Sequence, residues 1–198
     1  MPKTLIVVDV QVDFCPGGRL AVAGGDEIVA PINAMMDDYD HIILTQDWHP
    51  PNHSSFAVNH PMGEPYTLVN MDYGPQVLWP EHCVMGSPGA AFHPDLDISR
   101  AECVIRKGFR PAIDSYSAFF ENDYKTPTGL AGYLRERELE DLYFVGLAFD
   151  FCVSWSSVDA VRQGFRVHVI ESATRAIDLN ESRDAARRHM RGMGVELL

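Results

Sequence analysis

The sequence predicts an α/β fold: a three-layer sandwich with a central, mainly parallel sheet covered by helices on both faces. Runs rich in Val, Ile and Leu alternate along the chain with segments of helical pattern. Strands of that composition, alternating with helices, are typical of a buried parallel sheet. The length of 198 residues and the ordinary globular composition favour a single domain spanning residues 1–198.

The elements can be assigned in chain order from these runs. The expected strands are residues 4–10, 41–47, 102–108, 142–148 and 166–172, with a short last strand at 195–198. The expected helices are residues 25–39, 127–141, 153–164 and 179–194. Pro31 occupies the first turn of the first helix or kinks it. Asn180 or Ser182 is the expected N-cap of the last helix.

Composition and charge exclude several classes of partner. A net charge of −12 and a pI near 4.9 argue against binding nucleic acid or an anionic membrane. The apolar run at the N-terminus is interrupted by Asp9, and no stretch is long enough to cross a bilayer. The four cysteines are widely spaced without a CxxC pair, which favours free thiols and a cytoplasmic location.

One long segment, residues 48–101, departs from the alternation of strands and helices. It is rich in Pro, Gly, His and Trp and shows no clear periodicity. A connection of that length inside a domain is usually functional. A domain of this size needs no metal for stability, so a metal bound here would serve chemistry. We therefore expect a metal-site loop region at about residues 47–101.

Polar residues stand at the ends of the expected strands, where ligands bind in open α/β sheets. Asp9, Asp47 and Lys107 stand at the ends of the first three strands, and Cys152 follows the fourth at the start of a helix. Each has an ordinary structural interpretation when taken alone. Their occurrence on neighbouring strand ends predicts a catalytic group.

The chemistry of this group favours Cys152 as a nucleophile. The N-terminus of helix 153–164 and the ammonium of Lys107 both favour the thiolate. Asp9 is placed to take the thiol proton and return it to a leaving group. Backbone N–H groups of Ala148 and Cys152 are candidates for binding an oxyanion. The alternative is an inert buried thiol. The other cysteines, Cys15, Cys83 and Cys103, do not open a helix and are weaker candidates.

The long segment also contains candidate metal ligands. Asp47 and His49 are two residues apart in an extended stretch, so their side chains point the same way. His82 follows the rigid Pro80, and His53 is a ligand, a neighbour of the ligands or a surface residue. One carboxylate with two or three imidazoles suits Zn²⁺, the preferred ion, with Fe²⁺ and Mn²⁺ as alternatives. Such a site leaves positions open for water or a ligand.

The order and spacing of several motifs resemble the nicotinamidases, a family of the isochorismatase-like cysteine hydrolase superfamily. The motifs are "VDVQVDFCPGG", "TQDWHPPNHSSF", "LWPEHCV", "GSPGAAFHP", "IRKGF", "DSYSAF" and "VGLAFDFCV". Together they cover nearly the whole chain.

The resemblance implies a role for each site residue. It implies the catalytic triad Asp9, Lys107 and Cys152, and the metal ligands Asp47, His49 and His82, with His53 at a variable additional position. It also implies that Phe14 and Trp79 sandwich a pyridine ring, that Tyr116 lines the pocket, and that the Leu147–Ala148 peptide bond is cis. Core packing is the alternative interpretation of Phe14 and Trp79.

Two residues depart from the pattern of the family. Val12 stands where many members have Asn, and Phe149 stands where a small residue or Thr is usual. Neither is a member of the triad or a metal ligand. Phe149 is expected to narrow the pocket, or to alter a contact between subunits.

The function that the resemblance implies is hydrolysis of nicotinamide to nicotinate and ammonia through a cysteine thioester, with deamidation of pyrazinamide as a further activity. A metal ion would position the ring. The expected partner is a small amide, and association into a homo-oligomer is an open alternative. The rival interpretations are another amide or carbamoyl hydrolase of the superfamily, a hydrolase in which metal-bound water attacks, and a catalytically silent binding domain.

Overall fold

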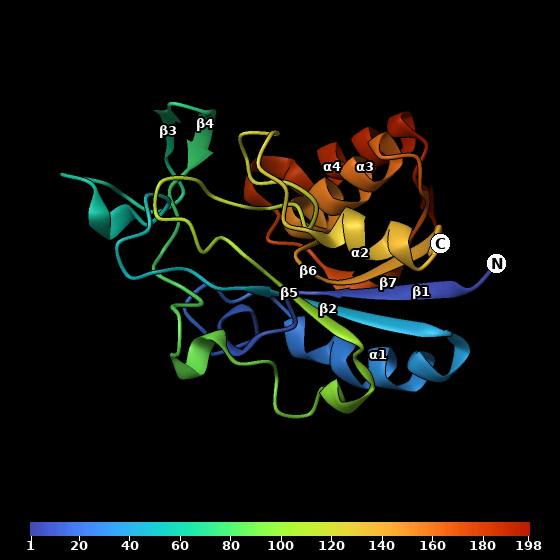
Figure 1. Ribbon diagram of the computed structural model, residues 1–198. Coiled ribbons are helices and arrows are strands. Elements are labelled where there is room, and N and C mark those ends of the chain that lie inside the picture. The colour runs from blue at the N-terminus through green and yellow to red at the C-terminus, as the bar shows by residue number, and fades with distance from the viewer.

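A computed structural model describes residues 1–198 and confirms the three-layer α/β architecture (Figure 1). Six parallel strands form the central sheet in the order β5-β2-β1-β6-β7-β8. The strands are β1 (Lys3–Val8), β2 (His41–Asp47), β5 (Cys103–Lys107), β6 (Asp141–Leu147), β7 (Arg166–Arg175) and β8 (Glu196–Leu197).

Helices cover both faces of the sheet, as predicted. In Figure 1, α1 (Val29–Met35) lies below the sheet, and α2 (Leu130–Glu136), α3 (Ser154–Arg162) and α4 (Ser182–Met193) lie above it. Side chains of β1 alternate between two apolar clusters, Leu5 and Val7 in one and Ile6 and Val8 in the other. Burial on both sides explains why the strand reads as a continuous apolar run.

Some predicted element boundaries are wrong. The expected helix 25–39 is a 3-10 turn (Gly25–Ile28), then α1, then a second 3-10 turn (Met36–Asp38). Helix α2 is shorter than the expected 127–141, because the backbone is left-handed at Gly129 before it and at Glu138 after it. Such conformations are incompatible with a continuing right-handed helix.

The predicted N-cap of the last helix is also wrong. Neither Asn180 nor Ser182 caps α4, because the residue before the helix is Glu181 and its side chain makes no capping bond. The Ser182 hydroxyl instead donates a hydrogen bond to Asp150. A contact with a distant part of the chain therefore replaces the local cap.

The long segment lies beyond the carboxyl ends of the strands, at the left of Figure 1. It contains an antiparallel hairpin, β3 (Leu68–Met71) and β4 (Gly74–Val77), which the sequence pattern does not indicate. Isolated bridges join His49 to Val84 and Phe56 to Trp79. The segment thus folds back on itself, so that the chain around residue 80 lies close to the chain around residue 50.

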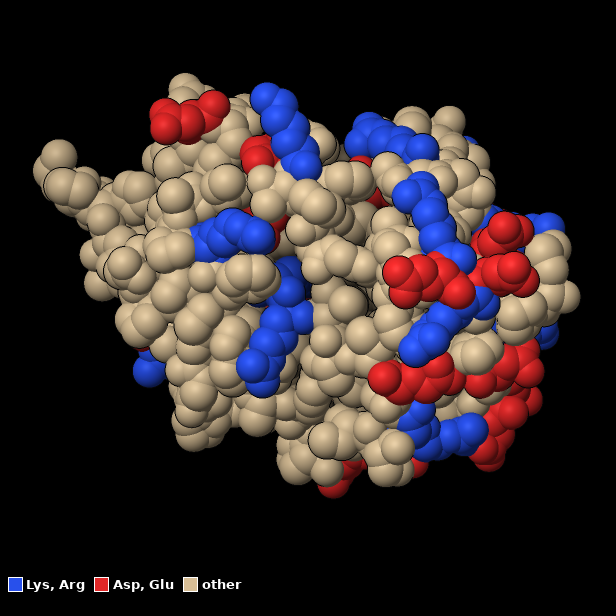
Figure 2. Space-filling model, viewed as in Figure 1, with Lys and Arg blue, Asp and Glu red and all other residues tan.

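Charged side chains are unevenly distributed over the surface. Figure 2 shows acidic and basic side chains interspersed at the right of the view and few charges at the left. Arg187 of α4, for example, pairs with Glu171 and Asp184. Ion pairs that remain accessible to solvent contribute little to stability. None of the helices has the length and apolar character needed to cross a membrane.

We expect Gly146→Ala to lower the free energy of unfolding by about 3 kcal/mol or more, as clashes in a core do. Gly146 lies in β6 with a φ of 109°, and a Cβ there would lie 2.1 Å from the carbonyl oxygen of Val8. Gly132 of α2 is a matched control, since its Cβ would meet nothing within 4 Å. Gly132→Ala should stabilise the protein by about 0.5–1 kcal/mol. Chemical denaturation measures both, and an unaltered midpoint for Gly146→Ala would contradict the prediction.

Candidate active site

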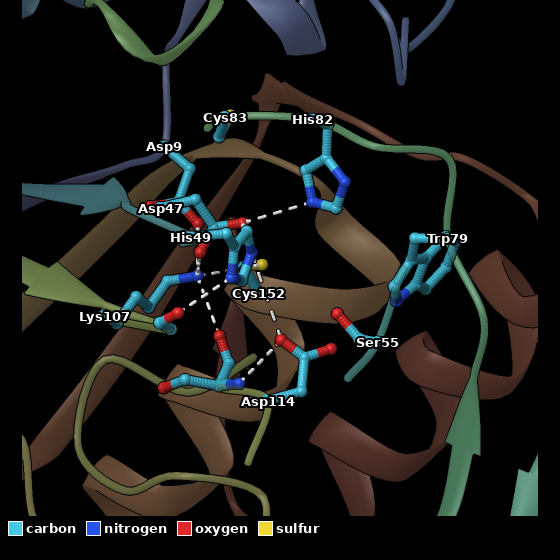
Figure 3. A network of polar contacts seen from close by, with 12 residues as sticks. Asp9, Asp47, His49, Ser55, Trp79, His82, Cys83, Lys107, Asp114 and Cys152 are labelled. Atoms are coloured by element: carbon cyan, nitrogen blue, oxygen red, sulfur yellow. Dashed lines mark hydrogen bonds and ion pairs between the residues drawn. The ribbon is translucent and has the colours of Figure 1, made fainter. Parts of the chain in front are cut away.

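Three side chains that the sequence places at strand ends meet in one buried cluster (Figure 3). Lys107 Nζ lies 2.7 Å from Asp9 Oδ2 and 3.4 Å from Cys152 Sγ. Asp9 and Lys107 are fully buried, and Cys152 is 6% exposed. The ammonium therefore contacts both the carboxylate and the thiol directly.

Asp9 and Lys107 are held by the strands that they end. Asp9 directly follows β1, in a left-handed conformation with a φ of 47°. The Thr45 hydroxyl of β2 donates to Asp9 Oδ1 at 2.6 Å, which fixes the direction of the carboxylate. Lys107 is the last residue of β5, and its ammonium also donates to the Ser115 carbonyl oxygen at 3.0 Å and to Asp47.

Cys152 lies in a π-helical turn, Phe149–Val153, which leads into α3. Burial raises the pKa of its thiol well above the ordinary value, and Lys107 opposes this only in part. Asp9 and Asp47 both pair with Lys107, and both carboxylates further raise the thiol pKa. Burial and these two carboxylates therefore oppose the stabilisation of the thiolate by Lys107.

The neighbouring Asp9 is placed to accept the proton of the thiol. Burial raises the pKa of Asp9, and ion pairing with Lys107 partly offsets this. A carboxyl with a raised pKa is a stronger base than an exposed one. Burial opposes the charge on Lys107, but Asp47 and Asp9 hold its pKa well above the ordinary value. Lys107 therefore stays an ammonium while Asp9 is able to exchange a proton with Cys152.

A second cluster adjoins the first and has the form of a metal site. Asp47 Oδ2 lies 3.5 Å from His49 Nε2 and 3.7 Å from His82 Nε2. Ligand atoms around a tetrahedral ion such as Zn²⁺ lie about 3.4 Å apart. All three side chains are buried, and their ligand atoms lie within 4.8 Å of one another. Burial would raise the pKa of Asp47, but Lys107 and His49 hold it well below its usual range.

The other ring nitrogens of the two histidines are engaged by backbone carbonyls. His49 Nδ1 lies 2.9 Å from the Gly108 oxygen, and His82 Nδ1 lies 2.8 Å from the Pro80 oxygen. Such bonds place the proton on Nδ1 and leave Nε2 free to bind a metal. The donor set therefore fits a divalent ion.

Two polar residues that the sequence analysis did not select hold this cluster in place. The Gln11 side chain accepts a hydrogen bond from the Asp47 N–H at 2.8 Å and donates one to the Asp47 carbonyl oxygen at 2.9 Å. Asp13 Oδ2 accepts from the Cys83 N–H at 2.7 Å, directly after His82. Both residues lie in the motif "VDVQVDF", so the motif itself was their only signal in the sequence.

His53 lies against His49 but has partners of its own. The two imidazole rings have centroids 4.4 Å apart. His53 Nδ1 lies 2.8 Å from Ser55 Oγ, and its Nε2 lies 3.2 Å from the Ile113 oxygen. Burial lowers the pKa of His53 to about 4, so its ring is neutral. The structure groups His53 with His49 and Asp114, separately from Asp47 and His82.

A small pocket connects the thiol with the metal ligands. The predicted wall residues Phe14, Trp79 and Tyr116 line it, together with Ala148 and Cys152. Several further lining residues were not predicted from the sequence: Leu20, Asp114, Phe151 and Ile177. Trp79 Nε1 donates to the Tyr116 hydroxyl at 3.0 Å, so these two walls brace each other. The Leu147–Ala148 peptide bond at the edge of the pocket is cis, as predicted.

The expectation that Phe149 narrows the pocket is wrong. Phe149 is buried in one apolar cluster, whereas Phe14 and Trp79 belong to the cluster on the opposite face of the sheet. Arg187 of α4 lies over the ring of Phe149. The turn directs Phe151 into the pocket instead, where its ring meets the edge of Trp79 at 4.9 Å between centroids. Val12 does not line the pocket either, and its N–H donates to the Ala91 carbonyl oxygen. All four cysteines are free, as expected.

We expect His82→Ala to lose the bound metal while the protein stays folded. Removing one of three ligands leaves too few donors for tight binding of a divalent transition metal. Exposed His189 of α4 offers a matched control, and His189→Ala should keep the full metal content. Elemental analysis of both purified variants measures this, and full occupancy in His82→Ala would remove that residue from the site.

Comparison with known proteins agrees with this geometry. Residues 3–198 match the family profile described as the isochorismatase domain. The chain is 53% identical over 192 residues to the nicotinamidase of Acinetobacter baylyi, covering 97% of this chain and 90% of that one. A solved nicotinamidase–pyrazinamidase from Acinetobacter baumanii is 53% identical with a TM-score of 0.98, covering 100% of this chain and 95% of that one.

A further solved structure contains a metal. The pyrazinamidase of Pyrococcus horikoshii, in complex with zinc, is 33% identical with a TM-score of 0.81, covering 100% of this chain and 99% of that one. Together with the donor set of Asp47, His49 and His82, this supports a divalent metal in the present protein. The chain belongs to the isochorismatase domain family, and within it to the group of the nicotinamidases.

Proposed function

We propose that this protein hydrolyses nicotinamide to nicotinate and ammonia, and that it deamidates pyrazinamide by the same route. The observation that carries the proposal is the contact of Asp9, Lys107 and Cys152 in a pocket that also holds three metal-ligating side chains. The activities named for the similar proteins support it. A thiol with a base beside it is suited to acyl transfer from an amide.

The first half of the reaction forms a thioester on Cys152. Sγ attacks the carboxamide carbon while its proton passes to the Asp9 carboxylate. The backbone N–H groups of Ala148 and Cys152 are the proposed donors to the oxyanion. The tetrahedral intermediate collapses with cleavage of the C–N bond, and the proton held by Asp9 goes to the departing nitrogen, which leaves as ammonia.

The second half returns the enzyme to its starting state. Asp9, again ionised, accepts a proton from water as the water oxygen attacks the thioester carbon. The C–S bond then breaks, nicotinate leaves, and Sγ recovers a proton from Asp9. Lys107 keeps its proton throughout, and its positive charge stabilises whichever of Asp9 and Cys152 is anionic.

Asp47, His49 and His82 are the proposed metal ligands, and Zn²⁺ is the proposed ion, with Fe²⁺ and Mn²⁺ as alternatives. When bound, the ion would supply a Lewis-acidic position for the ring nitrogen of the substrate. We place His53 outside the ligand set, packed against the ring of His49, because both of its ring nitrogens have protein partners. Phe14 and Trp79 are the proposed faces that enclose the flat ring.

Release of ammonia from nicotinamide by the purified protein tests this function. The same sample is analysed for its metal content, and acetamide, which has no ring, serves as the comparison substrate. The proposal predicts turnover of nicotinamide and far slower turnover of acetamide. A metal-loaded, folded protein that releases no ammonia from nicotinamide would overturn the proposed function.

A further inference from the structure

A strained segment of backbone closes one side of the pocket. Residues 176–182, here called the strap, comprise the connection from β7 to α4 and the first residue of α4. The strap carries Ile177, which lines the pocket beside Cys152 and packs against the apolar cluster that contains Phe14 and Trp79. Three residues of the strap, none of them glycine, are left-handed: Asp178 at φ 59°, Asn180 at φ 52° and Glu181 at φ 63°. Such conformations persist only where surrounding contacts enforce them.

A single carboxylate holds the strap in place. Asp150 Oδ1 accepts from the Ile177 N–H at 3.0 Å, and Oδ2 accepts from the Asp178 N–H at 2.8 Å and from the Ser182 hydroxyl. Asp150 is only 6% exposed, and every hydrogen bond of its carboxylate goes to the strap. Bonds from N–H donors to a carboxylate are stronger than those between neutral groups.

Asp150 is also tied to the nucleophile by the chain. It lies two residues before Cys152 in the same π-helical turn, so the turn that presents the sulfur also anchors the strap. The aromatic walls Trp79, Tyr116 and Phe151 brace one another through ring contacts. Ile177 has no ring to take part in these contacts, so the backbone of the strap sets its position.

We infer that Ile177 limits the size of the ring that the pocket accepts, and that Asp150 is the positioning residue that holds Ile177 there. The inference rests on the proposed amide hydrolysis and adds a specificity determinant to it. Phe149, which departs from the family pattern, is buried in the apolar cluster that contains Ile6 and Val8. It does not line the pocket and therefore cannot limit the size of the ring. The ligand class concerned is nicotinamides with small substituents on the ring.

The experiment compares nicotinamide with its four ring-methylated derivatives, carrying the methyl group at position 2, 4, 5 or 6. For each variant, the ratio of kcat/KM for a methylated substrate to kcat/KM for nicotinamide is measured on one enzyme preparation. The ratio is insensitive to partial unfolding or incomplete metal loading. We expect Ile177→Ala to raise it about tenfold or more for at least one derivative, since one methyl group in an apolar pocket is worth about 10–200-fold.

Asp150→Asn should raise the same ratio for the same derivative. The asparagine side chain has one oxygen acceptor and turns an NH₂ group toward a backbone N–H, so the strap loses part of its anchor. The control Ser182→Ala keeps both bonds from Asp150 to the backbone N–H groups, and its ratio should stay within about twofold of wild type by the same reasoning. Should Asp150→Asn not fold, Asp150→Glu moves the carboxylate by one methylene group and should shift the ratio in the same direction.

The double variant Asp150→Asn/Ile177→Ala tests whether Asp150 acts through Ile177. Its ratio should equal that of Ile177→Ala alone, because the side chain that Asp150 positions has been removed. The inference would be overturned by an unchanged ratio in Ile177→Ala. It would also be overturned if the change in the ratio of the double variant were the product of the changes in the two single variants. Absence of nicotinamide hydrolysis in the wild-type protein would instead overturn the proposed function, so the two failures are distinguishable.

Discussion

Cys152→Ala is expected to lower kcat for nicotinamide by about 10⁶-fold, as loss of the nucleophile does in other enzymes that form covalent intermediates. The sulfur lies 3.4 Å from Lys107 Nζ, which also pairs with Asp9, and it lines the pocket. The substitution removes a small side chain at a position that is 6% exposed, and it leaves all three metal ligands in place. Steady-state kinetics with the variant measures the loss.

Thermal unfolding and metal content of the same variant are the controls, and both should match the wild type. The rival mechanism, in which metal-bound water attacks, makes the opposite prediction. It requires Cys152→Ala to keep substantial activity and removal of the metal to abolish it. That pair of results would show that the thiol is incidental.

Benzamide is expected to be a very poor substrate, with kcat/KM about 10⁴-fold below that of nicotinamide. Benzamide has the same carboxamide and the same flat ring, but it lacks the ring nitrogen. A pocket built to pair a polar atom of the substrate discriminates strongly against an analogue without that atom, because the buried partner is left unpaired. The three candidate ligands open onto the same pocket as Cys152, so one small ring can reach both.

Pyrazinamide provides the matched comparison, since it keeps a nitrogen at the corresponding ring position. Its hydrolysis should proceed at a rate comparable to that of nicotinamide. Similar kcat/KM values for benzamide and nicotinamide would show that the ring nitrogen is not recognised. The function would then be that of a general amidase of the same family.

The sheet and the reactive residues were predictable because they follow from local patterns. Apolar runs mark strands that are buried on both faces, and parallel strands present their carboxyl ends at one edge. Asp9, Lys107 and Cys152 were therefore expected at one edge of the sheet, and the strand order β5-β2-β1-β6 brings them together there. Asp47 and His49 are close for the simpler reason that they are two residues apart.

The supports of the site were not predictable, because they are contacts between distant segments. The hydrogen bond that the Cys83 N–H donates to Asp13 joins residues 70 positions apart, and no local pattern indicates it. The direction of Phe149 was misjudged because a π-helical turn, unlike a strand, has no simple alternation of side chains. The state of the Cys152 thiol depends on burial and on two carboxylates that share Lys107, which requires the full arrangement in space.

The central claim is that the amide is cleaved through a thioester on Cys152, and the most direct test is to trap that intermediate. The enzyme is mixed with excess nicotinamide, quenched in acid during turnover, digested, and analysed by mass spectrometry. We expect one nicotinoyl group on the peptide that contains Cys152 and none on the peptides that contain Cys15, Cys83 or Cys103. Full turnover of nicotinamide by the Cys152→Ala variant, with no acyl group on any wild-type peptide, would contradict it.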